Sequence, residues 1–82
     1  MTASDYRHRL LRKTLEGSFR EYGRGIQSEC TLEWAVGIAK GAIKKSGMPL
    51  DEVMGILLTV QVVSFDDMRI RRLNQLYKHL AS

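Results

Sequence analysis

The residues of this chain that could take part in catalysis or metal binding are few and lie far apart. His8 and His79 lack a carboxylate, cysteine or second histidine at the spacing of a metal site or an acid–base pair. Cys30 is the single cysteine, and no base or cation adjoins it to activate the thiol. The sequence therefore predicts no catalytic residue, no metal site, no cofactor and no small-molecule substrate, and we expect a protein that is not an enzyme.

Two pairs of carboxylates have a structural explanation. Asp51–Glu52 and Asp66–Asp67 each fall where a helix is expected to begin, and acidic side chains there stabilise the positive end of the helix dipole. Ser64 and Asp67 also match a capping box, in which a hydroxyl and an acid three residues later bond each other's backbone N–H groups. We therefore expect the last helix to start just after Ser64.

Basic side chains gather at two places that could contact nucleic acid. In the last expected helix these are Arg71, Arg72, Gln75 and Lys78. The first expected helix could add Arg9, Arg12, Lys13 and Arg20. A solvated basic face is common on any basic helical protein, so a small DNA-binding transcriptional regulator is kept as the alternative function.

The second expected helix carries small or apolar residues on two sides. One stripe holds Leu32, Ala35, Val36, Ala39, Ala42 and Ile43, and Trp34, Gly37, Ile38 and Gly41 lie on the other side. Glycines four residues apart let another helix approach closely, and a tryptophan offers the large apolar area of an interface anchor. We predict a protein interface at these four residues. Packing by the chain's own helices would explain the same pattern.

Apolar residues at spacings of three and four predict helices over residues 4–22, 31–45 and 50–58 and after Ser64. Residues 39–58 have the outline of a helix-turn-helix with its turn at Gly47. Its second helix lacks the side chains that read bases, so we expect a scaffold there rather than a recognition helix. The run from Leu57 to Val63 is ambiguous, because its β-branched residues favour extended backbone while the preceding pattern favours a continued helix. We assign helix to about Leu58 and then a short extended connection.

The length and composition of the chain limit the number of domains and the class of fold. A chain of 82 residues with 44% hydrophobic and 27% charged side chains predicts one globular domain over residues 1–82. We expect an all-α fold, a compact bundle of about four helices with the helix-turn-helix-like hairpin at its centre. The single cysteine excludes an intrachain disulfide and suits a reducing cytoplasm. The polar N-terminus and the short apolar runs predict neither a signal peptide nor a membrane span.

The net charge of +4 is unevenly distributed. Residues 1–25 carry six basic and three acidic side chains, residues 26–67 three and six, and residues 68–82 four and none. Such asymmetry suits an anionic partner or the docking of basic ends on an acidic middle. The two-sided second helix and the uncharged run from Met54 to Val63 together present more apolar surface than one small chain readily hides. We therefore expect a non-enzymatic, regulatory protein-interaction module that forms a homodimer and presents helical surfaces to a protein partner.

Overall fold

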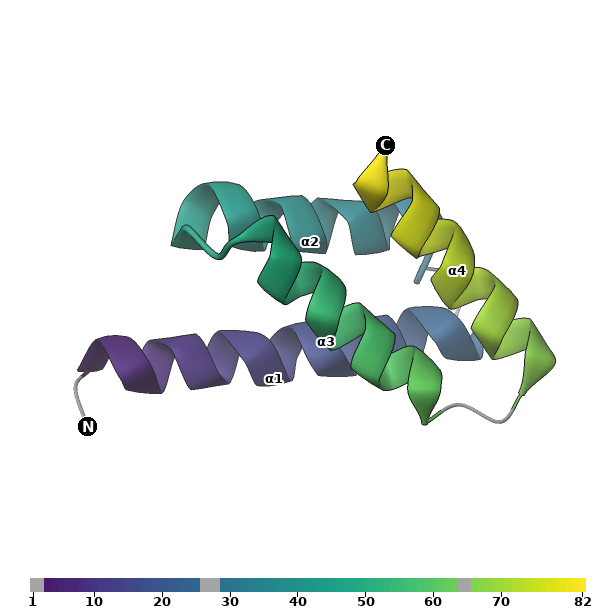
Figure 1. Ribbon diagram of the computed structural model, residues 1–82, viewed down its shortest axis with the longest axis horizontal. Helices are drawn as coiled ribbons and strands as arrows, with labels where there is room; N and C mark the ends of the chain where they lie inside the picture. The colour runs from purple at the N-terminus through teal and green to yellow at the C-terminus, as the bar shows by residue number, and fades with distance from the viewer. Residues whose placement is uncertain (1–2, 26–28, 64–65) are drawn as a thin grey trace.

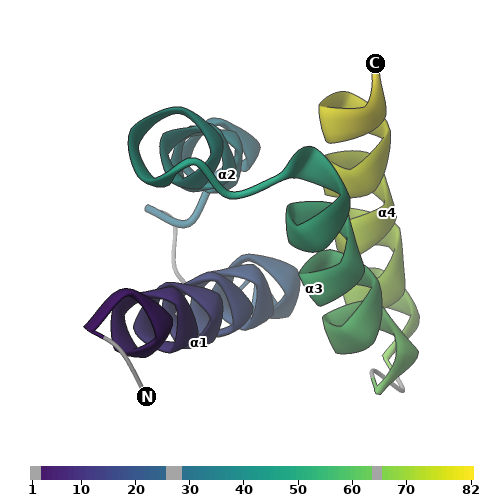
Figure 2. The same ribbon diagram turned by 60° about the vertical axis from the view of Figure 1, so that its left-hand side comes forward.

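The computed structural model describes residues 3–25, 29–63 and 66–82. Within these residues the chain forms four helices: α1 (Ala3–Arg24), α2 (Leu32–Ser46), α3 (Leu50–Val62) and α4 (Asp67–Ala81). Helices α1 and α2 run antiparallel as one hairpin, and α3 and α4 run antiparallel as a second (Figure 1). Figure 2 looks along the first hairpin and shows the second crossing it. The predicted all-α bundle is confirmed.

The hydrophobic core forms where the two hairpins cross. Each helix contributes the residues that its three- and four-residue spacing places on one side. The fully buried large side chains are Leu15, Phe19 and Tyr22 of α1, Val53, Leu57 and Val60 of α3, and Leu73 and Leu76 of α4. Helix α2 adds mainly alanines, at positions 35, 39 and 42. Small side chains on α2 let its backbone lie close to the other helices.

The helices of the first hairpin begin and end at residues whose types favour helix ends. Gly25 (φ 65°) follows α1, and Gly47 (φ 69°) caps α2, both in the left-handed conformation that glycine adopts without strain. The Thr31 hydroxyl accepts a hydrogen bond from the backbone N–H of Trp34 and caps the start of α2. Pro49 directly precedes α3. The predicted turn at Gly47 is therefore confirmed.

Helix α3 is longer than predicted. It continues to Val62, so the expected extended connection after Leu58 is wrong. Val60 is buried in the core, and the Thr59 hydroxyl donates to the Gly55 carbonyl oxygen within the helix. Tertiary packing of one valine and a local bond of the threonine outweigh the preference of β-branched residues for extended backbone.

The start of α4 also differs from the prediction. The helix begins at Asp67, and its N-cap is Asp66, whose carboxylate accepts from the backbone N–H groups of Met68 and Arg69. A start just after Ser64 is therefore wrong by two residues, and Ser64 itself lies outside the described residues. An ionised aspartate is a strong cap, because it combines charge with acceptor oxygens at the positive helix end.

The first turns of α1 extend beyond the second hairpin (Figure 1). Residues 5–10 are all exposed, and burial begins with Leu11. In the described part of the chain, no helix combines the length and the apolar character needed to cross a membrane.

Candidate interaction surfaces

The face of α2 that the sequence singles out is partly covered by the chain itself. Trp34 and Ile38 are half-buried and pack against the hydrophobic core. Gly37 is exposed and Gly41 half-buried, and a Cβ added at either would meet nothing within 4 Å. The structure therefore leaves room beside the two glycines, but uses much of the apolar area of Trp34 and Ile38 for its own packing.

The exposed apolar surface lies instead on α3 and the α3–α4 turn. Leu58 and Val62, four residues apart, share the outer face of α3 with Gly55 and are 41% and 79% exposed. Val63 and Met68 add exposed side chains at the end of the hairpin where α3 meets α4. We call Gly55, Leu58 and Val62 the α3 outer face. Sequence reasoning identified the uncharged run, but missed this face because it ended the helix at Leu58.

The basic residues predicted on α4 divide between two roles. Arg71, Gln75 and Lys78 are exposed, and the helical spacing places Asn74 on the same exposed face. Arg72 is half-buried: its Nε donates to the Tyr22 carbonyl oxygen at 2.8 Å, and its Nη2 to that of Cys30 at 3.2 Å. The guanidinium carbon also lies 4.4 Å from the centre of the Tyr22 ring. Arg72 therefore joins α4 to the end of α1 and to the segment before α2.

Three of the basic residues predicted on α1 are exposed but lie away from those of α4. Helix α4 meets α1 at its C-terminal end, where a Cβ on Gly23 would contact Arg69 and Leu73. Arg9 lies fourteen residues earlier, which is roughly 21 Å along a helix. The structure therefore separates Arg9, Arg12 and Lys13 from the exposed face of α4.

Two of the four α1 candidates contact acids. Arg12 lies 3.5 Å from the Glu52 carboxylate, and Arg20 forms an ion pair with Glu16 one turn earlier. Such contacts between exposed side chains contribute at most about 1 kcal/mol each, so they leave these arginines able to exchange partners.

His8 has a partner that the sequence did not reveal. Its Nε2 lies 2.6 Å from an Oε1 of Glu52, which also attracts Arg12, so one carboxylate connects two α1 residues to the start of α3. Forty-four residues separate His8 from Glu52, and no spacing rule brings them together.

Cys30 is buried. Among the described residues, no group of three histidine, cysteine or acidic side chains could hold a metal ion.

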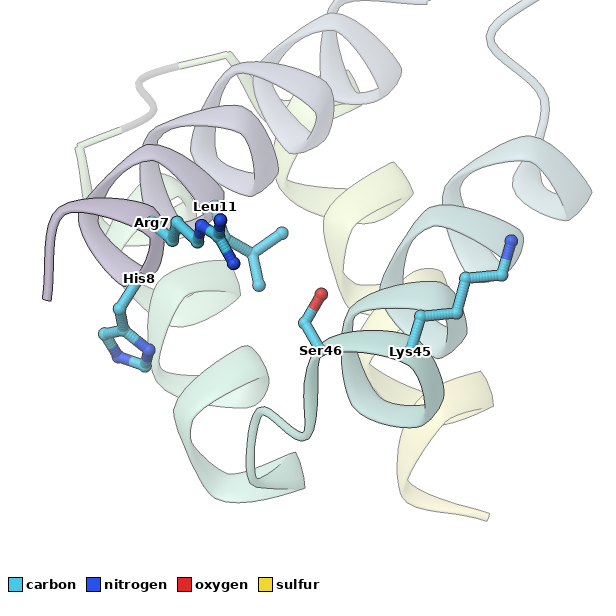
Figure 3. Close-up of a pocket in the computed structure, with 5 residues that line it drawn as sticks. All are labelled: Arg7, His8, Leu11, Lys45 and Ser46. Carbon is cyan, nitrogen blue, oxygen red and sulfur yellow. The ribbon is translucent and has the colours of Figure 1, made fainter. Parts of the chain in front are cut away.

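Several clefts open between the described helices, and two of them lie beside the end of α2. The first, of about 410 Å³, lies between α1 and the end of α2 and is lined by Arg7, His8, Leu11, Lys45 and Ser46. Figure 3 shows the Ser46 hydroxyl directed toward the gap and the Lys45 side chain directed away from Arg7 and His8. Its cations therefore do not converge on one point.

The second cleft, of about 420 Å³, lies where the end of α2, the start of α3 and the end of α4 meet. Three apolar side chains, three basic ones and one serine line it: Ile43, Leu50, Leu80, Lys40, Lys44, His79 and Ser82. We call it the α2–α3–α4 cleft.

Comparison with known proteins does not supply a functional site for this chain. No protein-family model matches it, and neither a curated protein nor a solved structure matches it. The surfaces that could carry function are therefore defined by the chain's own geometry: the α3 outer face, the exposed polar face of α4 and the α2–α3–α4 cleft.

Proposed function

We propose that this chain is a non-enzymatic, regulatory protein-interaction module that forms a homodimer through the α3 outer face and presents its other helical surfaces to a partner. The observation that supports it is the exposure of Leu58 and Val62 beside Gly55, with further exposed apolar side chains at the adjacent turn. Contiguous exposed apolar residues mark interaction sites on soluble domains. We place the module in the cytoplasm, where the single, buried Cys30 stays reduced.

The charge distribution favours a second copy of the chain as the occupant of this face. At a net charge of +4 two copies repel each other on average, and contacts through the basic faces of α1 or α4 oppose like charges. The segment from Met54 to Val63 carries no charged side chain. A twofold contact there brings together two identical uncharged surfaces.

The α3 outer face is short, and its small area limits the affinity of the two copies for each other. Helix α3 has 13 residues, and a helix of that length is about 20 Å long. Stable interfaces bury about 800 Å² on each partner, more than one such helix face offers. We therefore expect a dissociation constant in the micromolar range, at which the dimer responds to changes in protein concentration.

Sedimentation equilibrium over a range of protein concentrations tests the proposal. The average mass of the wild type should rise from the 9.4 kDa of the monomer toward twice that value. The double variant Leu58→Lys, Val62→Lys should stay monomeric, because four lysines would face each other across the twofold contact. The control Asn74→Lys, Gln75→Lys adds the same charge on the exposed face of α4 and should still dimerise. A wild type that is monomeric at high micromolar concentration overturns the proposal.

A pair of glycine variants separates the α3 outer face from the α2 face predicted from sequence. Gly37 and Gly55 are both exposed helical residues with nothing within 4 Å of an added Cβ. Gly55→Gln should weaken dimerisation by obstructing the close approach of a second α3, and Gly37→Gln should leave it unchanged. Weaker dimerisation of the Gly37 variant alone would instead indicate a dimer interface on α2.

DNA binding is a second candidate, favoured by the exposed polar face of α4. Arg71, Asn74, Gln75 and Lys78 share that face, and these residue types make the common contacts with guanine, adenine and phosphate. Binding of duplex DNA, followed by fluorescence anisotropy during a salt titration, should then weaken steeply with salt and be lost in Arg71→Ala, Lys78→Ala. Arg72 is left intact because its substitution would disturb the fold. Absent or salt-independent binding rules out this candidate.

A further inference from the structure

The α2–α3–α4 cleft combines an apolar floor with a basic rim. Leu80 is buried, Ile43 is half-buried, and Leu50 at the first position of α3 remains 43% exposed. The core does not require an exposed leucine at that position, where helices favour polar residues. Its exposure within a concave surface marks a place where another apolar side chain can pack.

The rim carries two lysines of α2 and one histidine of α4. Lys40 and Lys44 lie one turn apart on α2, and His79 approaches from the last turn of α4. Cations near helix C-termini stabilise the helix dipole, which accounts for Lys44 in the last turn of α2. Lys40 lies a turn earlier than that effect reaches, so the dipole does not account for its position. No acidic side chain belongs to the described lining of the cleft.

We infer that the α2–α3–α4 cleft binds an acidic amphipathic segment of a partner protein, one apolar side chain of the segment packing on Leu50 and Ile43 and its carboxylates lying against Lys40 and Lys44. Charge complementarity selects an acidic occupant. The apolar floor selects an amphipathic one, in the manner of a helix laid in a groove.

The openness of the cleft favours a polypeptide over a small molecule. Small-molecule sites typically bury 70–90% or more of the ligand surface. A cleft whose floor residue Leu50 stays 43% exposed does not enclose a ligand to that extent. A polypeptide needs no enclosure, because its contacts continue outside the cleft.

This site is separate from the α3 outer face and does not depend on the proposed dimer. Leu50 and Val62 lie at opposite ends of α3, roughly 18 Å apart. Peptide binding at the cleft and dimerisation through the α3 outer face can therefore be tested independently of each other.

The test uses a fluorescein-labelled synthetic peptide whose leucines and glutamates alternate at helical spacing, with a scrambled peptide of the same composition as its control. Binding is measured by anisotropy with the Leu58→Lys, Val62→Lys variant, so that self-association does not contribute. NMR spectra of the isotope-labelled protein then locate the peptide. We expect shifts at Ile43, Leu50 and Leu80 and at least fivefold weaker binding of the scrambled peptide.

Matched variants test the two halves of the cleft. Leu50→Gln should weaken binding about tenfold, the loss expected for one buried apolar contact, whereas Leu10→Gln, at an exposed leucine of α1 outside the cleft, should leave it unchanged. Lys40→Gln, Lys44→Gln should weaken binding and flatten its salt dependence, whereas Arg9→Gln, Lys13→Gln should do neither. Equal binding of the scrambled peptide, shifts confined to other residues, or an unchanged affinity of the Leu50 variant overturns the inference. So does tight binding of decanoate without the peptide, or concentration-dependent shifts at the cleft that identify a second copy as its occupant.

Discussion

Arg72 shows how a single side chain changes its role once the fold is known. Along the sequence it belongs to a series of polar residues on α4 and has the type of a phosphate contact. In the structure its guanidinium group bonds the carbonyl oxygens of Tyr22 and Cys30, which are 50 and 42 residues away. Only the crossing of the two hairpins brings these groups within reach, so sequence spacing could not identify them.

Substitution of Arg72 should destabilise the fold, and substitution of Arg71 should not. Arg72→Ala is expected to lower the free energy of unfolding by about 2–3 kcal/mol, since it removes two charge-assisted hydrogen bonds to part-buried carbonyls and the contact with the Tyr22 ring. The exposed neighbour gives the control: Arg71→Ala should stay within about 0.5 kcal/mol of the wild type. Urea denaturation followed by the fluorescence of Trp34, the single tryptophan, measures both. Equal stability of the two variants would contradict the role given to Arg72.

Tyr22 makes the stability of the fold depend on pH in the alkaline range. Burial raises the pKa of its phenol above the ordinary value of 10.0, and the charge of Arg72 offsets part of that rise. The folded chain therefore holds the phenolic proton more tightly than the unfolded chain does. This contribution to stability is complete below pH 10.0 and is lost as the pH rises through the higher pKa of the folded state.

The free energy of unfolding should therefore decline above about pH 10, and Tyr22→Phe should remove part of that decline. Urea denaturation at a series of alkaline pH values gives the slope. A decline that is as steep in Tyr22→Phe as in the wild type would show that other groups cause it.

Among the elements, α1 and α2 could be read from the sequence and the end of α3 could not. Leu11, Leu15, Phe19 and Tyr22 all face the core as their spacing predicts, and Gly47 ends α2 where a left-handed residue is needed. The segment after Leu58 holds competing signals: a helical period, and a run of residues that favour strands. The burial of Val60 decides between them, and burial depends on partners elsewhere in the chain.

Two glycines of α1 test how the packing of one helix varies along its length. An added Cβ at Gly17 meets nothing within 4 Å, whereas at Gly23 it would lie 2.9 Å from Cγ of Arg69 and 3.3 Å from Cγ of Leu73. Gly17→Ala should therefore raise the free energy of unfolding by about 0.5–1 kcal/mol through helix propensity. Gly23→Ala should lower it, because α4 must move away from α1. Thermal and urea denaturation of the two variants measure the difference, and a gain in stability at both positions would contradict the close approach of α4.

At the scale of the whole molecule, the chain exposes more surface than its mass requires. Its accessible surface is 5682 Å², against about 5,000 Å² for a typical compact monomer of this size. The molecule measures 39 × 23 × 22 Å, and the projecting start of α1 lies along its longest dimension. An elongated shape of this kind exposes more surface than a compact one of the same mass.

Salt should act in opposite directions on the proposed interactions of the molecule. Dimerisation brings together two chains of net charge +4 through an uncharged face, so added salt screens the repulsion and should strengthen it several-fold. DNA or an acidic peptide should bind more weakly under the same conditions. Sedimentation in low and high salt checks the first expectation, and dimerisation that weakens with salt would point to a contact made by charged residues.

The sequence predicted the number of helices and the segment that holds exposed apolar residues, but not the surfaces that the helices create together. Lys40, Leu50 and His79 are far apart along the chain, and no pattern relates them before three helix ends converge. Trp34 illustrates the reverse: its type predicted an interface, and the chain's own core covers part of it.

The order of the two hairpins along the chain bears on how the domain assembles. Each hairpin pairs segments that are neighbours along the chain, whereas most contacts between helices join one hairpin to the other and close longer loops. The bonds of Arg72 require both hairpins to be docked. These hydrogen bonds should therefore form after the rate-limiting step of folding. They should lower the unfolding rate of the domain and leave its folding rate unchanged.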